Sequence, residues 1–151
     1  MYTFEFSRWE TVNAGVPQGS TLGPFLFLLF INDIENEVLN NIKMFADDTS
    51  LYYVVEDQMS ATESLNEDLV CIHQWSSDWG ITLNATNTKS MLFSRKTMAN
   101  LPPLFVNGTM LENSKSHKHL GVTFNSNGKW NNHINEIYIK ACRRINILRM
   151  M

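Results

Sequence analysis

Residues 43–55 read Lys-Met-Phe-Ala-Asp-Asp-Thr-Ser-Leu-Tyr-Tyr-Val-Val and are the most informative stretch of this 151-residue chain. Two short runs rich in aromatic and β-branched residues, 43–46 and 50–55, flank Asp47-Asp48-Thr49, which predicts a β-hairpin with two carboxylates at its bend. Hard cations such as Mg²⁺ prefer carboxylate oxygens, and a tight turn presents them clear of the sheet. Adjacent residues of a strand point to opposite faces, so a complete metal site needs a further carboxylate from another strand.

The segment before this hairpin predicts a loop followed by a helix. Residues 15–19, Gly-Val-Pro-Gln-Gly, have the composition of a loop, and Ser20 or Thr21 can cap a helix that runs to about Leu39. Pro24 is tolerated in the first helical turn, where the backbone amide has no intrahelical partner. Because the helix is apolar nearly all round at 25–31, we expect it to be buried.

The segment after the hairpin predicts a second helix and then several strands. Apolar residues recur at helical spacing from Leu65 to Trp79, and Gly80 provides the stop. Strands are expected at 81–84 and 89–94 around a polar turn at 85–88, on either side of Asn107-Gly108, and at 119–124. The last stretch, from Trp130 to Leu148, predicts an amphipathic helix. Helices and antiparallel strands in this order indicate an α+β fold.

The charge is unevenly distributed along the chain. The formal net charge is −3, but residues 1–75 contain two basic and twelve acidic side chains, whereas residues 76–151 contain ten basic and three acidic ones. Charges separated by more than a Debye length of about 8–10 Å do not cancel locally. A basic second half is typical of a surface that faces a polyanion, although such asymmetry also arises by chance.

The cysteines and the hydropathy exclude several other classes of protein. Cys71 and Cys142 lie far apart, without a C-x-x-C motif, so we expect reduced thiols rather than a disulfide framework or a zinc module formed with neighbouring histidines. The longest apolar run, 25–31, is much shorter than the roughly 18–20 residues that span a bilayer. No signal peptide is visible, and we expect a soluble, intracellular protein without a membrane partner.

Three segments in series carry a resemblance to a known family. Residues 15–24, Gly-Val-Pro-Gln-Gly-Ser-Thr-Leu-Gly-Pro, are followed by an apolar run ending in Asn32-Asp33-Ile34 and then by Phe45-Ala46-Asp47-Asp48. In this order they resemble the reverse transcriptases of LINE-type (non-LTR) retrotransposons, notably the Jockey-like group. Weaker matches follow in the family's order at 75–90, at 119–122 and at 130–134, so the resemblance covers residues 9–150.

The resemblance implies catalytic and nucleotide-binding roles for the matching residues. Asp47 would be a catalytic metal ligand and Asp48 its supporting neighbour, while Lys89 would act near the triphosphate, where an ammonium group can neutralise charge or donate a proton. The pocket in which the incoming nucleotide meets the templating base would be lined by Pro17, Gln18 and Gly19. Mg²⁺, with Mn²⁺ as a substitute, would be the cofactor, and a deoxynucleoside triphosphate the substrate.

The resemblance also implies an architecture and nucleic-acid partners. Residues 1–125 would form a partial palm, with the buried helix, the Asp-Asp hairpin, the amphipathic helix and further antiparallel strands, and residues 126–151 would begin the thumb. The RNA template and DNA primer would meet two groups of residues, namely His119, Leu120 and Gly121 in a primer-gripping hairpin and Lys140, Arg143 and Arg144 on the thumb helix. An active parent element would place the protein in the nucleus or in a cytoplasmic ribonucleoprotein.

One expected feature of the family is missing from this sequence. The first catalytic Asp lies upstream of the Gly-Val-Pro-Gln-Gly loop in a complete enzyme, and here the acids before Gly15 are Glu5 and Glu10, neither in a matching motif. The chain is therefore interpreted as a fragment that is inactive alone. Without the missing strand, we expect the hairpin carrying Met44, Phe45, Leu51 and Tyr53 to leave an unpaired apolar edge.

Other interpretations of these residues stay open. The alternative function is that of a non-catalytic relic that binds only nucleic acid or a partner protein. Each motif also has an ordinary structural explanation. Residues 15–19 can simply begin a helix, Lys89 and His119 can be surface residues, and the basic residues of the last helix can form a solvated face. An unrelated Mg²⁺ phosphotransferase is disfavoured, because no Gly-rich phosphate-binding loop with a Lys follows a strand.

Overall fold

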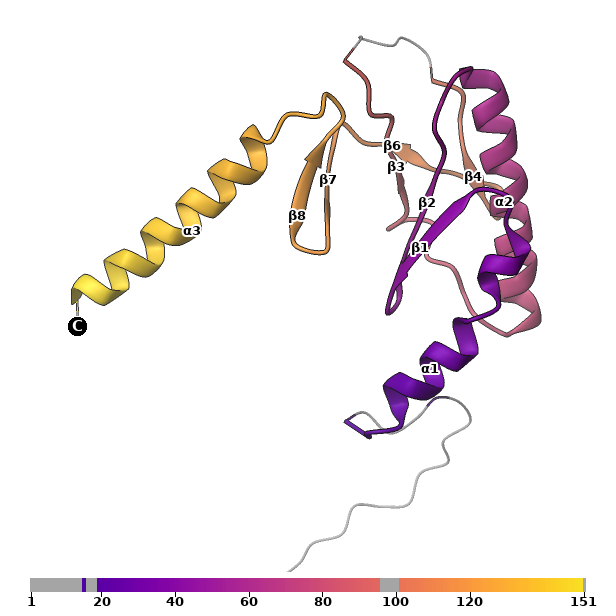
Figure 1. Cartoon of the computed structure of the whole chain (residues 1–151), viewed down its shortest axis with the longest axis horizontal. Coiled ribbons are helices and arrows are strands. Elements are labelled where there is room, and N and C mark those ends of the chain that lie inside the picture. Colours follow the sequence, from indigo (N-terminus) through magenta and orange to yellow (C-terminus); the bar gives the residue numbers. More distant parts are fainter. Residues whose placement is uncertain (1–14, 16–18, 96–100, 151) are drawn as a thin grey trace, which may run out of the picture.

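The computed structural model describes residues 15, 19–95 and 101–150 (Figure 1). The first half contains the helix α1 (Gly23–Ile31), the 3-10 helix η1 (Ile34–Glu37), the strands β1 (Asn41–Phe45) and β2 (Asp48–Tyr52), and the long helix α2 (Gln58–Asp78). The second half contains β3 (Lys89–Ser90), β4 (Phe105–Val106), β5 (Thr109–Met110), β6 (Glu112–Asn113), β7 (Ser116–His119), β8 (Val122–Asn125) and α3 (Asn131–Met150). This mixture of helices and small two-stranded sheets, most of them antiparallel, agrees with the predicted α+β class.

Helix α1 begins as predicted but ends earlier. The Ser20 hydroxyl accepts a hydrogen bond from the Gly23 amide at 2.9 Å, and Pro24 occupies the first turn. The helix stops at Ile31, and η1 follows, so the prediction of one helix reaching Leu39 was wrong. At the break, the Asp33 carboxylate accepts a hydrogen bond from the indole N–H of Trp75 at 3.2 Å. This bond to α2 redirects the chain where a continuous helix was expected.

The apolar surface of α1 is mostly exposed, and the prediction of a buried helix was wrong. Only Gly23 and Ile31 are buried, whereas the exposed fractions of Phe25, Leu28 and Leu29 are 58%, 57% and 59%. The apolar sequence leads to an expectation of burial on all sides, but the described residues cover only the C-terminal end of this helix. A helix that is hydrophobic all round is normally surrounded by other protein, which the described residues do not provide along most of α1.

The strands β1 and β2 form the predicted hairpin. The antiparallel ladder runs from Asn41 opposite Tyr52 to Phe45 opposite Asp48, which leaves Ala46 and Asp47 as a two-residue turn. The bend therefore lies one residue earlier than predicted, because Asp48 is already paired in β2. Met44 and Leu51 pack against the core, whereas Phe45 is 65% exposed. The predicted apolar edge is thus only partly present.

Helix α2 is the element around which the first half of the chain packs. It begins at Gln58, where the Asp57 carboxylate accepts a bond from the Ser60 amide at 2.8 Å, and it ends before Gly80, whose φ is +68°. The core consists of Ile31, Ile34, Ile72 and Trp75, with Ile42, Met44 and Leu51 of the hairpin packed against it. Figure 1 shows the hairpin lying along α2. The predicted helix is confirmed, although Trp79 at its end is 47% exposed rather than buried.

The region after α2 differs from the predicted strand pair. Residues 81–84 form no strand, and β3 pairs in parallel with β6, with Lys89 opposite Glu112. The predicted polar turn exists, because the amides of Asn87 and Thr88 both donate to the carbonyl oxygen of Asn84. The hairpin at Asn107-Gly108 is confirmed, with φ values of +48° and +70° at the two turn residues.

The predicted strand at 119–124 is instead the turn and second strand of a third hairpin, after β1–β2 and β4–β5. Strands β7 and β8 pair antiparallel, and Leu120 and Gly121 form the turn with φ values of +48° and +83°. The prediction of a single strand was wrong because Leu120 adopts a left-handed conformation that its side chain disfavours. The glycine that follows was the one local sign of a turn.

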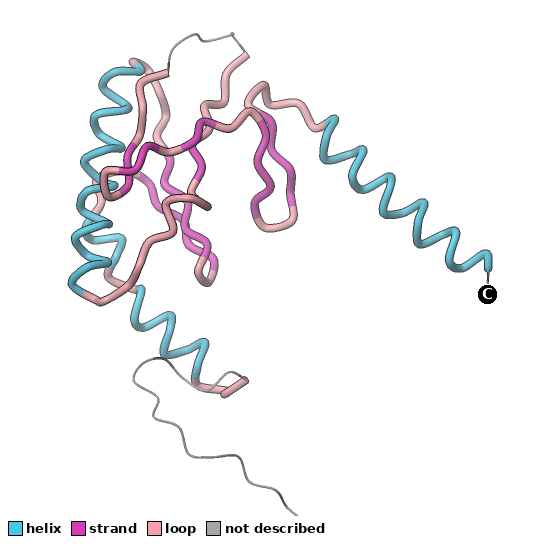
Figure 2. The backbone as a smooth tube through the Cα atoms, turned by 180° about the vertical axis from the view of Figure 1, so that it is seen from behind, coloured by secondary structure: helices cyan, strands magenta, loops and turns pink. Residues whose placement is uncertain are grey.

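Helix α3 is confirmed, and it is attached to the rest of the chain near its beginning. The Thr123 hydroxyl donates to the Glu136 carboxylate at 2.9 Å, and the Thr123 amide donates to Nδ1 of His133 at 3.2 Å. Trp130 packs on Phe124 with a ring-centroid distance of 5.7 Å. Beyond these contacts α3 extends away from the other elements in both views (Figures 1 and 2). Its apolar stripe is exposed, with Ile134, Ile137 and Leu148 exposing 61%, 52% and 70%.

The attachment of α3 is expected to weaken in acid. The hydrogen bond from Thr123 lowers the pKa of Glu136 below its usual 4.5, and the neighbouring Lys118 ammonium acts in the same direction. A carboxyl with a lowered pKa in the folded state contributes stability that is complete above its unfolded value and is lost as the pH falls through the folded value. We expect the tryptophan fluorescence of Trp130 to change over that range, and the Glu136→Gln variant to lose this pH dependence. An unchanged acid transition in the variant would contradict the assignment.

Large apolar side chains are exposed on α1 and α3. Among the described residues, no helix is long and apolar enough to cross a membrane.

Candidate functional site

The Asp-Asp hairpin places its two carboxylates in solvent at one end of the β1–β2 sheet. Asp47 is the second residue of the turn, Asp48 is the first residue of β2, and both side chains are exposed. Exposure at a tight turn leaves their oxygens free to meet a ligand that approaches from outside the sheet. The position of the pair therefore agrees with the predicted presentation of two carboxylates.

The turn that carries Asp47 has an unusual backbone. Ala46 has a φ of +52°, which a residue with a Cβ atom adopts only at a cost of about 1–3 kcal/mol. A positive φ at the first of two turn residues is characteristic of the type II′ hairpin turn, whose twist matches that of the strands. The ladder from Asn41 to Tyr52 maintains this conformation against the cost at Ala46.

The two carboxylates at this turn are of the kind that binds divalent cations, but two are too few for a stable site. Carboxylate oxygens are the ligands that Mg²⁺ prefers, and a stable site needs several of them. Within the described part of the chain, no group of three or more His, Cys, Asp or Glu side chains comes together in a metal-binding arrangement. A complete metal site at this turn would therefore need a further carboxylate from another segment.

The turn at Leu120-Gly121 and the Asp-Asp hairpin are joined by a side-chain contact. Nε2 of His119, the last residue of β7, lies 3.2 Å from the hydroxyl of Ser50 in β2. His119 is half-buried, whereas Leu120 is 50% exposed and Gly121 lies at the tip of its hairpin. The structure thus places one predicted site residue, His119, against Ser50, which lies two positions after Asp48 in β2.

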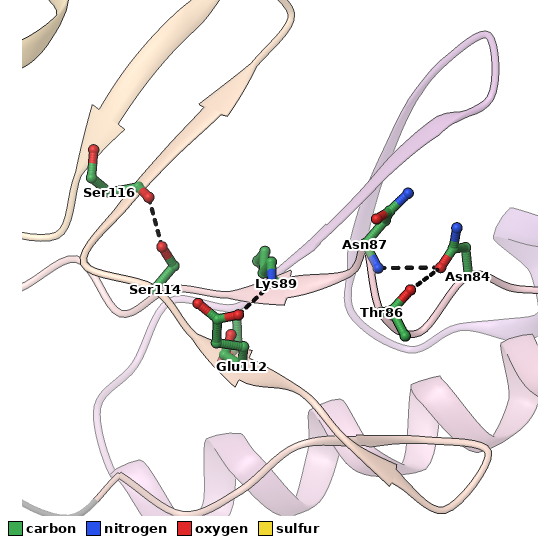
Figure 3. A network of polar contacts seen from close by, with 8 residues as sticks. Asn84, Thr86, Asn87, Lys89, Glu112, Ser114 and Ser116 are labelled. Atoms are coloured by element: carbon green, nitrogen blue, oxygen red, sulfur yellow. Dashed lines mark hydrogen bonds and ion pairs between the residues drawn. The ribbon is translucent and has the colours of Figure 1, made fainter.

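The predicted triphosphate-binding lysine is held by an acidic neighbour. The Lys89 ammonium forms an ion pair with the Glu112 carboxylate across the β3–β6 ladder (Figure 3). The side chain of Glu112 is 67% exposed and that of Lys89 is 26% exposed, so the pair lies at the surface. An exposed pair contributes about 0–1 kcal/mol, and an incoming anion can compete with Glu112 for Lys89.

Two of the three predicted nucleotide-pocket residues, Pro17 and Gln18, lie outside the described residues. Gly19 is described, and its φ of +83° is in the left-handed region that glycine adopts without strain. A Cβ atom at Gly19 would meet nothing within 4 Å, so its backbone conformation, rather than a close neighbour, requires glycine there. The structure neither brings Gly19 to the other site residues through a hydrogen bond nor buries it.

The basic residues of α3 are exposed and far along a helix that projects from the body. Lys140, Arg143 and Arg144 are all exposed. Within the described ranges, the ion pairs are Lys89–Glu112 and Lys118–Glu136, and neither involves these three residues. Their charges are therefore available to a polyanion.

Three residues that contact this site were missed at the sequence level. Asp68 of α2 binds the backbone just before β1, Ser50 contacts His119, and Glu112 pairs with Lys89. A signal existed only for Asp68, which falls on the same helical face as Ile72 and Trp75, where a carboxylate is unexpected. Ser50 and Glu112 acquire their partners through contacts distant in sequence, which periodicity does not reveal.

Comparisons with known proteins agree with the resemblance seen in the motifs. The family described as reverse transcriptase (RNA-dependent DNA polymerase) matches residues 2–124. The chain is 32% identical over 141 residues to the RNA-directed DNA polymerase from mobile element jockey of Drosophila melanogaster, and 30% identical over 141 residues to its counterpart in Drosophila funebris. It is 27% identical over 155 residues to the probable RNA-directed DNA polymerase from transposon BS of Drosophila melanogaster.

These matches cover most of this chain but only a small part of each relative. The jockey matches cover 87% of this chain and 15% of each relative, and the BS match covers 97% of this chain and 17% of the relative. The chain thus spans about one sixth of the length of the curated relatives it matches. No solved structure matches it. The family match nevertheless covers most of the chain and contains the Asp47-Asp48 hairpin, and the chain belongs to the reverse transcriptase (RNA-dependent DNA polymerase) family.

Proposed function

We propose that this chain is part of the polymerase domain of a non-LTR retrotransposon reverse transcriptase, with residues 1–125 in the palm and residues 126–151 at the start of the thumb. The observation that carries the proposal is the Asp-Asp hairpin, whose exposed turn presents two carboxylates in a chain of this family. The complete polymerase would extend a DNA primer on an RNA template by nucleotidyl transfer.

Asp47 and Asp48 would hold Mg²⁺ or Mn²⁺ together with a carboxylate from another segment. Asp47 lies at the turn and would be the principal ligand, whereas Asp48 is paired in β2 and would support it. When bound, a divalent ion at such a site stabilises negative charge on the reacting phosphate oxygens. The chain's own contribution would be to fix the two carboxylates on a rigid two-residue turn.

The other predicted residues would serve the substrate and the nucleic acid. Pro17, Gln18 and Gly19 would line the nucleotide pocket, and Lys89 would exchange Glu112 for the triphosphate. The β7–β8 turn, with His119, Leu120 and Gly121, would contact the primer. The contact between His119 and Ser50 supports this arrangement, because it fixes the β7–β8 hairpin relative to the strand that begins with Asp48.

A matched pair of polypeptides tests the polymerase proposal. The 151-residue chain alone is expected to show no primer extension with Mg²⁺ and deoxynucleoside triphosphates, because the described residues bring no three metal-ligating side chains together. A polypeptide that adds the upstream segment of a jockey relative is expected to extend a primer. Absence of activity in every such extended polypeptide, with its folding verified, would refute the assignment.

A second function is favoured by the exposed basic face of α3, namely nucleic-acid binding without catalysis. We expect the chain alone to bind an RNA–DNA duplex at low salt, with an affinity that falls steeply as salt increases. Replacing Lys140, Arg143 and Arg144 together by Ala is expected to reduce the slope of log K against log salt by up to about 2.7, since each phosphate contact contributes about 0.9. Fluorescence anisotropy titrations at several salt concentrations measure this slope.

Two control variants test whether binding depends specifically on the basic residues of α3. Lys43→Ala removes a basic residue of the β1–β2 hairpin and is expected to leave the slope unchanged. Asp47→Asn is likewise expected to bind as the wild type does, since a carboxylate makes no favourable contact with phosphate. If the chain does not bind at low salt, the basic face of α3 is only a solvated surface.

A further inference from the structure

Asp68 is a carboxylate buried inside the molecule. It lies on the face of α2 that carries the buried residues Ala61, Ile72 and Trp75, and only 1% of its surface is exposed. Neither ion pair found among residues 19–95 and 101–150 involves Asp68. A buried carboxylate without a cation costs several kcal/mol unless hydrogen bonds compensate for its lost hydration.

The compensation comes from the two residues that precede β1. The amide of Leu39 donates to one oxygen of Asp68 at 2.7 Å, and the amide of Asn40 donates to the other at 3.0 Å. The side-chain amide of Asn40 adds a third bond to Asp68 at 2.6 Å and donates to the hydroxyl of Ser64 at 2.9 Å. Hydrogen bonds to a charged acceptor are roughly twice as strong as neutral ones, so this is a firm and directional attachment.

The attachment lies at one end of the hairpin that carries Asp47 and Asp48. Leu39 and Asn40 connect η1 to β1, and the β1–β2 ladder begins at Asn41. A two-stranded hairpin has little stability alone and depends on what it packs against. Ile42, Met44 and Leu51 pack against the core, but apolar contacts are non-directional and do not fix where along α2 the strand begins. The fork of bonds to Asp68 does fix it.

We propose that Asp68 is a positioning residue for the Asp47–Asp48 turn, acting through Leu39 and Asn40 on the start of β1. The positioning follows from the hydrogen bonds of Asp68 alone. Its importance for function rests on the proposed metal-binding role of the turn. Asp68 fixes the position of the start of β1 along α2. Because β1 leads directly into the turn, the position of the turn is fixed as well.

The test replaces the carboxylate by its amide in the full chain. Asp68→Asn keeps the size of the side chain but replaces one acceptor oxygen by an NH₂ group. A donor then meets a donor of Leu39 or Asn40, so one or more hydrogen bonds are lost. Native-state hydrogen exchange is expected to become at least about tenfold faster for amides of the β1–β2 ladder, consistent with the loss of a charge-assisted bond. Exchange in the β4–β5 ladder is expected to stay at the wild-type rate.

The matched control is Glu67→Gln, which removes one negative charge from the adjacent, exposed position of the same helix. It is expected to leave exchange in both ladders unchanged. Equal acceleration of both ladders in Asp68→Asn would show that Asp68 supports only the overall fold, and no acceleration would show that it positions nothing. Either result overturns the inference. If Asp68→Asn does not fold, Asn40→Ala, which removes only the side-chain bonds, is expected to accelerate the β1–β2 ladder selectively and to a smaller extent.

A paramagnetic metal separates this inference from the proposed function. Mn²⁺ is expected to broaden the amide resonances around Asp47 in the wild type, to do so at about tenfold higher concentration in Asp68→Asn, and not to do so in Asp47→Asn. Absence of broadening in the wild type would contradict the metal-binding proposal while leaving the exchange experiment to decide the role of Asp68. Equal Mn²⁺ titrations of wild type and Asp68→Asn would refute its effect on the turn.

Discussion

Replacing Asp47 by Asn is expected to reduce primer extension by about 10³-fold in a polypeptide that joins this chain to the upstream segment of a jockey relative. The substitution keeps the shape of the side chain and removes its charge, so the proposed metal site would lose its principal ligand at the exposed turn. A loss of this size corresponds to about 4 kcal/mol of transition-state stabilisation. Single-nucleotide incorporation under rapid-quench conditions measures the rate of the chemical step directly.

The control for this experiment is Glu56→Gln. Glu56 is an exposed acid between β2 and α2, outside the hairpin turn, and its neutralisation is expected to leave incorporation within about twofold of the wild type. Asp48→Asn is expected to have a smaller effect than Asp47→Asn, because Asp48 is proposed as the supporting rather than the principal ligand. Incorporation by Asp47→Asn at the wild-type rate would show that the turn does not hold the catalytic metal.

Replacing Trp75 by Ala is expected to lower the free energy of unfolding by about 3–5 kcal/mol, as for other large aromatic residues removed from a core. Trp75 is 6% exposed and belongs to the cluster that joins α1, η1, α2 and the hairpin. Its indole N–H donates to Asp33, and its ring lies 6.3 Å from that of Phe30, measured between centroids. Small domains have total stabilities of about 5–15 kcal/mol, so this single change removes a large share of the free energy of unfolding. Urea denaturation followed by circular dichroism measures the loss.

Trp79→Ala is the matched control, because it removes the same side chain one helical turn later. Trp79 is 47% exposed, although its ring packs edge-on against Phe30 at a centroid distance of 5.2 Å. It buries roughly half as much of its surface, so its replacement is expected to cost less than about half as much. Trp75→Phe separates the two contributions of Trp75, since it retains most of the packing and loses the bond to Asp33. Equal effects at positions 75 and 79 would show that this core cluster does not determine stability.

Elements whose signals are local in sequence were predictable. The spacing from Leu65 to Trp79 with Gly80 as the stop gave the observed end of α2, and Asn107-Gly108 gave the observed hairpin. The Asp-Asp hairpin was predicted with its bend displaced by one residue, because Ala46 occupies a turn position that usually belongs to glycine or asparagine. The family, too, was recognisable from local motifs.

Features that depend on distant partners were not predictable. The parallel pairing of Lys89 with Glu112 joins segments 23 residues apart, and neither segment shows the alternation of a half-buried strand. The burial of α1 was predicted from its apolar sequence, which does not show whether other segments of the chain cover the helix. Asp68 illustrates the same limit, because its partners are backbone amides of Leu39 and Asn40, which every sequence possesses.

Because α3 is attached only by its first turns, a small rotation there displaces its far end by a larger distance. The contacts to Thr123 and Asn125 end at Glu136, and the helix continues to Met150. Fourteen residues at about 1.5 Å each carry the far end about 21 Å from that joint. A rotation of about 10° at the joint therefore moves the far end by nearly 4 Å, more than the length of a hydrogen bond to a phosphate. Small adjustments among Thr123, His133 and Glu136 thus change the position of the far end of α3 relative to the β7–β8 hairpin.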